Sequence, residues 1–392
     1  VGRSLGAMSV AVLGSAILQY AIYFWIARYL GLADYGVFSL ALTVAVLAAP
    51  WTDLGVGVWI AHVAAADATT RRSPVLPHAL GQAIAWRAAL LVPVAAVAAA
   101  YALLAVRPEV AWVLLPLGLA AFFDGLATLA GAVHQANQRM PASAWITIRR
   151  NLVRALAFGS AVVLGLRLEA LAWVLLAGSL ITGGAPWLHL LRSESIAWDW
   201  PRLPAMRRAL PFGIAVLAVL LHTQVDVVML DWLGADGSSE VGAYHAGTRF
   251  LVLAMLIPQV VAQALAPLDY RLGAVGPEGL GLLYRQKSMA IGALGLLGAM
   301  TLVFGGPDLV HLLLGGEFAV SAPIVIATGP VLLAKFLSSP IADALCGLNR
   351  QARWGTIALL GLIINVLANL ALIPCAGALG AATATAMKLG AA

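Results

Sequence analysis

Long apolar segments recur along the whole chain, and they constrain its fold more than any other feature of the sequence. Each contains roughly 20 residues or more, enough for a helix to cross about 30 Å of hydrocarbon. Such segments fold as helices because backbone polar groups inside a bilayer must be satisfied within the segment. Charged residues make up only 10% of the chain, whereas a soluble domain carries about a quarter. The sequence therefore predicts an all-α polytopic membrane protein.

Twelve spans are expected, six on each side of a polar connector. The connector at 192–208 separates a first six-helix lobe, 1–191, from a second one, 209–392. The spans are placed at 5–30, 35–62, 79–106, 110–135, 143–166 and 168–191, then at 209–233, 241–268, 289–314, 319–348, 354–374 and from 378 onward. The last span is incomplete, and the chain begins with Val1 rather than Met. We therefore expect a slightly truncated N-terminus.

Lysine and arginine are distributed unevenly between the two expected sides of the membrane. Fifteen lie at span ends on the side of the N-terminus and connector, and three on the other side. The fifteen include Arg149, Arg150, Arg285 and Lys287. Short cytoplasmic loops carry the excess of basic residues in membrane proteins. The N-terminus and the connector are therefore expected to be cytoplasmic.

Two similar pentapeptides open the second and the eighth span. DYGVF begins at Asp34 and EVGAY begins at Glu240, 206 positions later. Each has an acid, a bulky residue, a glycine, a small apolar residue and an aromatic residue in that order. Six spans lie between them, so both face the same side of the membrane. This predicts a parallel repeat about an axis along the membrane normal, in which superposing 1–191 on 209–392 aligns the second span with the eighth.

The sequence contains no pattern for an enzyme, a cofactor or a metal. It has no Gly-rich phosphate loop with lysine, no HxxxH, no CxxC and no soluble nucleotide-binding segment, so we expect no ATP hydrolysis. The two cysteines, Cys346 and Cys375, lie in apolar surroundings without metal-ligand spacing and are expected to be small buried residues. No basic run with interleaved aromatics occurs, and we expect no nucleic-acid partner.

Several stretches resemble polysaccharide-biosynthesis flippases, the Wzx-type branch of the multidrug/oligosaccharidyl-lipid/polysaccharide (MOP) exporter superfamily. In the second half, LPFGIAVLAVLLHTQVDVVMLDWLGADGSSEVGAYHAGTRF resembles the family's seventh and eighth spans, and GALGAA at 377–382 resembles the opening of its twelfth. In the first half, ARYLGLADYGVFSLALTVAVLAAPWTDLGVGVWIA resembles the second-span signature. Family members usually have 12 to 14 spans, so this chain departs from the pattern by stopping inside the twelfth.

The resemblance implies two six-helix lobes around a central cavity in the bacterial cytoplasmic (inner) membrane. It implies that the protein moves a polyprenyl-diphosphate-linked oligosaccharide from the cytoplasmic to the outer leaflet by alternating access. The transported lipid is used for surface polysaccharide biosynthesis. The protein is expected to work as a monomer among membrane lipids. Two alternatives remain open. A cation-coupled multidrug antiporter of the same fold would favour an acidic cavity. A membrane-embedded glycosyltransferase or polymerase of the same pathway would need a large outer loop or an acidic catalytic motif.

Five basic residues fall inside the expected spans, where a charge is costly and marks a candidate functional position. If they face the gap between the lobes, Arg249, Arg154, Lys335 and Arg87 form a cationic cavity suited to a diphosphate, because arginine offers phosphate a planar fork and lysine a point charge. Snorkelling of the side chain to the membrane surface is the alternative, above all for Lys388 and Arg87.

Four acidic residues inside the spans are candidates for coupling transport to a proton or Na⁺. Asp53, Asp124, Asp226 and Asp343 are each also possible structural partners of a base. Asp226 is the strongest coupling candidate, because His222 lies one turn earlier on the same helical face and a carboxylate beside an imidazole titrates near neutrality.

Two pairs of amides also share a helical face within the spans. Asn365 and Asn369 are one turn apart, as are Gln259 and Gln263. Amide side chains in membrane spans commonly hydrogen-bond to neighbouring helices. We expect that role here, with contacts to sugar hydroxyls as the alternative.

Overall fold

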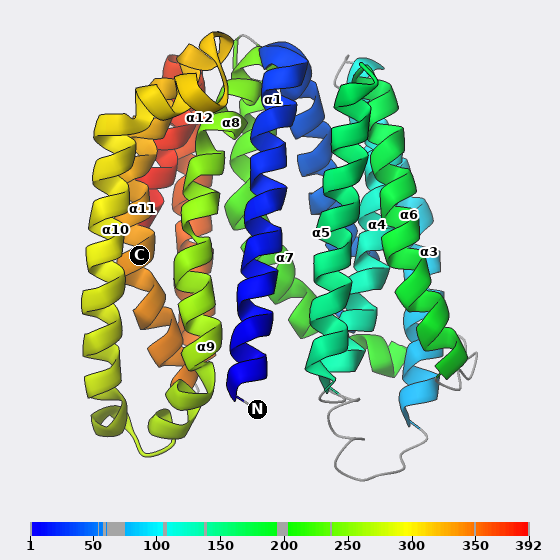
Figure 1. Cartoon of the computed structure of the whole chain (residues 1–392), viewed down its shortest axis with the longest axis vertical. Helices are drawn as coiled ribbons and strands as arrows, with labels where there is room; N and C mark the ends of the chain where they lie inside the picture. The colour runs from blue at the N-terminus through cyan, green and yellow to red at the C-terminus, as the bar shows by residue number, and fades with distance from the viewer. Residues whose placement is uncertain are drawn as a thin grey trace. The chain divides into compact units, whose positions relative to one another are not determined.

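The computed structural model describes residues 2–53, 55–57, 60, 75–104, 108–136, 139–193, 203–235, 237–348 and 350–390. Within these ranges the chain is helical apart from short turns, and no strand occurs there (Figure 1). Seven of the described helical segments are long and apolar enough to cross a membrane. The prediction of an all-α polytopic membrane protein is confirmed.

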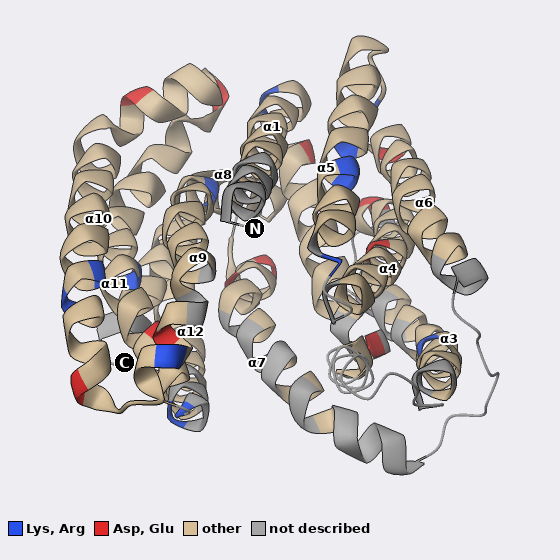
Figure 2. Cartoon of the chain, turned by 60° about the horizontal axis from the view of Figure 1, so that its bottom comes forward, with Lys and Arg blue, Asp and Glu red and all other residues tan. Residues whose placement is uncertain are grey.

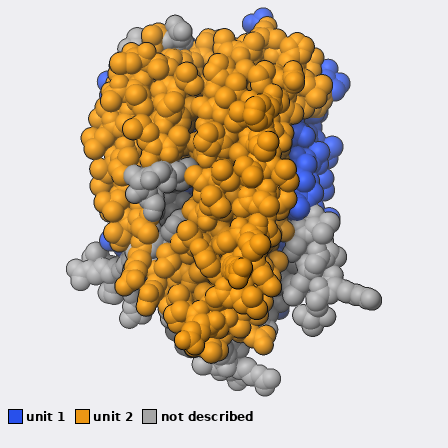
Figure 3. All heavy atoms as spheres, turned by 90° about the vertical axis from the view of Figure 1, so that its left-hand side faces the viewer, with its two compact units in different colours: residues 1–22, 37–220 blue, residues 23–36, 221–392 orange. Residues whose placement is uncertain are grey.

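The chain forms two compact units, residues 1–22 with 37–220 and residues 23–36 with 221–392 (Figure 3). The first unit contains parts of α1 (Gly2–Asp53) and α7 (Leu203–Leu233). Between them in the sequence are α3 (Val75–Leu104), α4 (Pro108–Ala136), α5 (Met140–Val163) and α6 (Leu168–Ser193). The core of this unit contains residues of α3, α4 and α6, among them Leu80, Leu129 and Trp187.

The second unit contains the remaining helices. These are α8 (Ser238–Ala254), α9 (Leu256–Gly273), α10 (Pro277–Leu313), the 3₁₀ helix η1 (Gly316–Ser321), α11 (Ala322–Gly347) and α12 (Gln351–Gly390). Residues 23–36 also belong to this unit, whereas the sequence assigned all of 1–191 to one lobe. The division of the repeat at 191 and 209 stays a prediction.

As far as they are described, the twelve expected spans lie largely within helix, although the span at 241–268 is divided at Met255 into α8 and α9. The helix α1 covers the first two spans and breaks at Gly31, where φ is 76° and ψ is 175°. The last two spans lie in α12, which breaks at Gly377 with φ of 51°. Glycine adopts a positive φ without the steric cost that a side chain adds. These two glycines therefore separate consecutive spans without an intervening loop.

Several basic residues that the sequence places at inner span ends lie within helices. Arg149 and Arg150 lie well inside α5, which begins at Met140 (Figure 2). Lys287 lies inside α10, which begins at Pro277 rather than near residue 289, and its side chain is buried. A hydropathy criterion places the end of a span at charged residues. Here the helices continue past these residues, whose side chains contact neighbouring helices.

The glycines of the two repeated pentapeptides contact each other inside the second unit. A Cβ on Gly36 would overlap the carbonyl oxygen of Ser238 and lie 3.1 Å from the backbone nitrogen of Gly242. A Cβ on Gly242 would overlap the carbonyl oxygen of Leu32 and lie 3.1 Å from the backbone nitrogen of Gly36. Each glycine thus faces the carbonyl four residues before the other. The two glycines lie 206 positions apart, and so do the two residues whose carbonyls they face, Leu32 and Ser238, as a local two-fold arrangement requires.

Replacing Gly36 with alanine is expected to lower the unfolding temperature of the protein, because the added methyl group has to push two backbones apart. Gly14→Ala is the matched control in the same helix, since a Cβ there meets nothing within 4 Å. That control is expected to be neutral or stabilising, because alanine favours helix over glycine. Thermal unfolding of both variants in detergent measures the difference. Equal stability of the two variants would contradict close packing at Gly36.

Candidate functional site

Asp226 in α7 is a buried carboxylate with hydrogen-bond donors from two other helices of the second unit. Its side chain is 2% exposed. It accepts hydrogen bonds from Tyr244 Oη in α8 at 3.0 Å, and from Thr385 Oγ1 and Asn369 Nδ2 in α12 at 2.9 and 2.6 Å. Tyr244, Thr385 and Asn369 are neutral groups, and burying a charge is costly unless it is well hydrogen-bonded. These three hydrogen bonds compensate in part for the burial of the carboxylate.

Further polar atoms lie next to the Asp226 carboxylate. Asn369 Nδ2 also donates to Asn365 Oδ1 at 3.3 Å, and both amide side chains are buried. Asn369 Oδ1 is buried and has no hydrogen-bond partner among the described residues. One carboxylate surrounded by hydroxyl and amide oxygens suits a single positive charge, either a proton or a hard monovalent cation. The helix-bridging role expected for Asn369 is confirmed, with Asp226 as its partner.

The pairing of Asp226 with His222 lies outside the side chains that the structure describes. The sequence did not predict that Tyr244, Thr385 and Asn369 surround Asp226. Tyr244 is the aromatic residue of EVGAY, and Thr385 follows the GALGAA stretch. The repeat and the resemblance therefore marked both segments, although neither indicated that they meet at Asp226.

Arg249 in α8 lies against aromatic and imidazole groups of the second unit. Its guanidinium carbon is 4.3 Å from the centroid of the Tyr23 ring, a distance at which the ring attracts the cation. Its Nη2 is 3.4 Å from His245 Nε2, and His245 Nδ1 is 3.4 Å from the hydroxyl of Tyr35. Tyr35 also packs edge-on against Phe318. The ring of Tyr23 and the polar contact with His245 orient the guanidinium.

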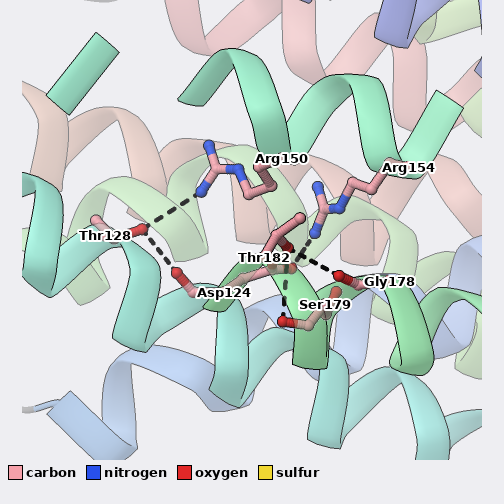
Figure 4. Close-up of polar contacts among 7 residues, drawn as sticks. All are labelled: Asp124, Thr128, Arg150, Arg154, Gly178, Ser179 and Thr182. Atoms are coloured by element: carbon pink, nitrogen blue, oxygen red, sulfur yellow. Dashed lines mark hydrogen bonds and ion pairs between the residues drawn. The ribbon is translucent and has the colours of Figure 1, made fainter. Parts of the chain in front are cut away.

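Two candidate bases of the first unit pair with two candidate acids. Arg87, which is 5% exposed, forms an ion pair with Asp53. The backbone N–H of Gly57 also donates to both oxygens of the Asp53 carboxylate, at 3.2 Å each. Arg154 in α5 forms an ion pair with Asp124 in α4 (Figure 4). Sequence reasoning had assigned the bases to substrate and the acids to coupling ions, and the structure brings each base together with an acid.

Asp343, the remaining acidic candidate, belongs to a buried triad in the second unit. Lys287 Nζ in α10 lies 2.7 Å from Asp343 Oδ2 in α11 and 2.8 Å from Asp269 Oδ2 in α9. The triad lies one turn from the point where Gly273 and Gly347 bring the ends of α9 and α11 into backbone contact. One ammonium thus ties together three helices.

Lys287→Met is expected to lower both the yield of folded protein and its unfolding temperature. The substitution keeps an apolar stem of similar length but leaves two buried carboxylates without their cation, which is strongly destabilising. Arg285→Met is the matched control, because Arg285 lies in the same helix and is exposed. Thermal unfolding in detergent checks this expectation. A Lys287→Met protein as stable as the control would show that the triad does not hold these helices together.

The other basic candidates are placed less completely. Lys335 lies in α11 and is half-buried, and the side chain of Lys388 lies outside the described residues. Among the described residues, no group of three or more His, Cys, Asp or Glu side chains is arranged to hold a metal ion.

Comparisons with known proteins add to this geometry. A family model described as "Polysaccharide biosynthesis protein" matches residues 1–269. A search of curated proteins finds no significant match. The lipid II flippase MurJ in an inward closed conformation is similar in structure, with a TM-score of 0.81 and 12% identity over 98% of this chain and 85% of that chain.

Other solved structures have the same fold. An inward-facing multidrug resistance MATE family transporter of the MOP superfamily has a TM-score of 0.76 and 12% identity over 97% of this chain and 94% of that one. A MOP superfamily transporter from Pyrococcus furiosus has a TM-score of 0.62 and 13% identity, with coverages of 97% and 92%. At such identities the likeness shows the MOP fold alone. Because the family model matches more than half of its residues, the chain belongs to the polysaccharide biosynthesis protein family.

Proposed function

We propose that the protein moves a polyprenyl-diphosphate-linked oligosaccharide from the cytoplasmic to the outer leaflet of the bacterial cytoplasmic membrane, by alternating access and without changing it chemically. The observation that carries this proposal is the match to the polysaccharide biosynthesis family over residues 1–269. The shared fold supports it, because a flippase of another lipid-linked precursor, lipid II, has the same architecture. Surface polysaccharides are assembled from lipid-linked units, so the family's pathway needs such a step.

Arg249 is the residue that we propose to contact the diphosphate. Its guanidinium lies over the Tyr23 ring and near His245 Nε2, and these contacts orient the group. Guanidinium binds phosphate through two parallel hydrogen bonds. A cationic drug would be repelled by such a group, and this observation favours an anionic substrate over a drug antiporter of the same fold.

Asp226 is the residue that we propose to couple flipping to a proton or Na⁺. Its carboxylate is buried and accepts hydrogen bonds from hydroxyl and amide groups of α8 and α12, and a buried carboxylate can bind a proton or a hard cation. The membrane potential adds to this driving force. A substrate with about two negative charges gains roughly 4 to 5 kcal/mol on leaving a cytoplasm at about −100 mV, because each charge contributes about 2.3 kcal/mol.

Reconstitution tests the proposed function directly. The full chain is placed in liposomes that contain a lipid-linked oligosaccharide with a fluorescent sugar, and an impermeant quencher reports the fraction of label on the outside. Vesicles with the protein are expected to re-equilibrate the label between leaflets much faster than protein-free vesicles. No flipping, together with ion-driven accumulation of a cationic dye, would instead assign the protein to the drug antiporters.

A further inference from the structure

The carboxylate of Glu240, the acid of the EVGAY pentapeptide, lies where three helices of the second unit approach one another. Glu240 is in the first turn of α8, and its Oε1 accepts a hydrogen bond from the backbone N–H of Ala378 at 3.0 Å. Ala378 is the first residue after the break of α12 at Gly377. A Cβ on Gly234, which directly follows α7, would overlap Glu240 Oε2. One carboxylate therefore contacts both the end of α7 and the break in α12.

The backbone at the break of α12 leaves room for this carboxylate. A Cβ on Gly377 would overlap Glu240 Oε1, and the φ of 51° at Gly377 also disfavours a side chain. Three residues later, a Cβ on Gly380 would overlap the carbonyl oxygen of Leu372, so the chain turns sharply here. The first N–H groups of a helix have no partner within that helix. Glu240 therefore caps the segment 378–390 from a different helix.

The three helices that approach one another at Glu240 also build the cluster around Asp226. Tyr244 lies one turn after Glu240 in α8, and Thr385 lies about two turns after Ala378 in α12. Both hydroxyls donate to the same oxygen, Asp226 Oδ2, at 3.0 and 2.9 Å, and they lie 3.4 Å from each other. The helices α8 and α12 are thus joined at two levels. The position of 378–390 along α8 decides whether both hydroxyls reach one carboxylate oxygen.

We propose that Glu240 is a positioning residue for the cation site at Asp226. Its carboxylate fixes the start of the segment 378–390 against α8, and thereby the place of Thr385 beside Asp226. This inference rests on the proposed function, in which Asp226 binds a proton or Na⁺. A shift of about 1 Å in this segment takes a hydrogen bond of normal length out of its range. Glu240 acts here as a hydrogen-bond acceptor, so a neutral side chain of the same shape can replace it.

Flipping at varied concentrations of the coupling ion tests this role in liposomes that contain the full chain. Initial rates at increasing Na⁺ or H⁺, whichever drives the parent, give a half-saturating concentration and a maximal rate. Glu240→Ala is expected to shift the half-saturating concentration by about tenfold, with a maximal rate within about threefold of the parent. A loss of folded protein alone lowers the maximal rate and leaves the half-saturating concentration unchanged.

Two further variants serve as controls. Glu240→Gln keeps an acceptor oxygen for the N–H of Ala378, and its half-saturating concentration is expected within about twofold of the parent. Glu278→Ala removes an exposed glutamate from the first turn of α10 in the same unit, and it should change neither quantity.

Three results would overturn the positioning role. An unchanged half-saturating concentration in Glu240→Ala would show that the Asp226 cluster keeps its geometry without this contact. A Glu240→Gln protein as altered as Glu240→Ala would show that the charge of Glu240 is required, which assigns it to ion binding instead. If Glu240→Ala does not fold, Glu240→Asp shortens the side chain by one methylene group and should give the same shift. Parental behaviour of that variant would contradict the proposal.

The same measurements separate this role from the proposed function. A parent protein that flips no lipid-linked oligosaccharide contradicts the proposed function and the positioning role with it. A parent that flips the lipid but responds to neither ion contradicts coupling at Asp226, and therefore also a residue that positions its site. A parent that responds to one ion, with a Glu240→Ala protein that responds at the same concentration, contradicts the positioning role alone.

Discussion

Asp226→Asn is expected to reduce gradient-driven flipping by about tenfold or more while substrate binding stays within about twofold of the parent. The amide has nearly the same shape as the carboxylate, so Tyr244 and Thr385 keep a neighbour of the same size. It carries no charge, however, and therefore cannot bind a proton or Na⁺ in exchange. The ligand contacts that we propose involve other residues, so the binding step is preserved.

Two imposed gradients separate the possible coupling ions. Initial flipping rates are measured in vesicles with a pH gradient in the absence of Na⁺, and in vesicles with a Na⁺ gradient at constant pH. The parent should respond to one of them, and Asp226→Asn should respond to neither. Asp308→Asn is the control, because Asp308 is an exposed acid of the same unit and its loss should leave both responses unchanged. Equal gradient-driven rates for Asp226→Asn and the parent at matched expression would remove Asp226 from the mechanism.

The sequence was sufficient to predict the helices because membrane spans are encoded locally. A run of about 20 apolar residues identifies a span whatever surrounds it, and the twelve expected spans lie largely within helix in the described residues. The partners of Asp226 could not be predicted in this way. Tyr244 is 18 positions away and Thr385 is 159 positions away, so their meeting depends on how α7, α8 and α12 pack.

The position of Lys287 could not be predicted from the sequence either. Counting bases by loop treats each one as solvated, and on that basis Lys287 was expected at an inner span end. In the structure it is buried between Asp269 and Asp343. Neither acid is adjacent in sequence, and nothing local distinguishes this lysine from an exposed one. The orientation stays a prediction, which the different position of Lys287 does not reverse because the imbalance is fifteen to three.

The sequence predicts that the two pentapeptides form a repeat, but it does not predict that they contact each other. Their spacing of 206 positions indicated that one feature occurs twice on the same side of the membrane. The structure adds that Gly36 and Gly242 pack against each other's helix. This explains why each pentapeptide has a glycine at its centre, because any side chain there would meet the partner's backbone.

Arg249→Ala is expected to insert and fold normally but to lose most transport, a drop of about tenfold or more. The reason lies in the described contacts of the guanidinium, which are the face of the Tyr23 ring and His245 Nε2. A bidentate phosphate contact is a strong charge-assisted interaction, so its loss is expected to weaken transport more than folding. Flipping of the lipid-linked oligosaccharide and binding of the same lipid are measured in parallel, with Arg271→Ala, an exposed arginine at the end of α9, as the control.

Arg249→Lys distinguishes a phosphate contact from simple positive charge. Lysine keeps the charge but has no planar fork, so transport should recover only in part if Arg249 binds the diphosphate. Full recovery would mean that charge alone matters at this position. A structural role gives the opposite pattern, because a broken buried pair lowers the amount of folded protein. Loss of Arg249→Ala from the membrane would therefore assign Arg249 to the scaffold. Stable Arg249→Ala protein with weak lipid binding assigns it to the substrate.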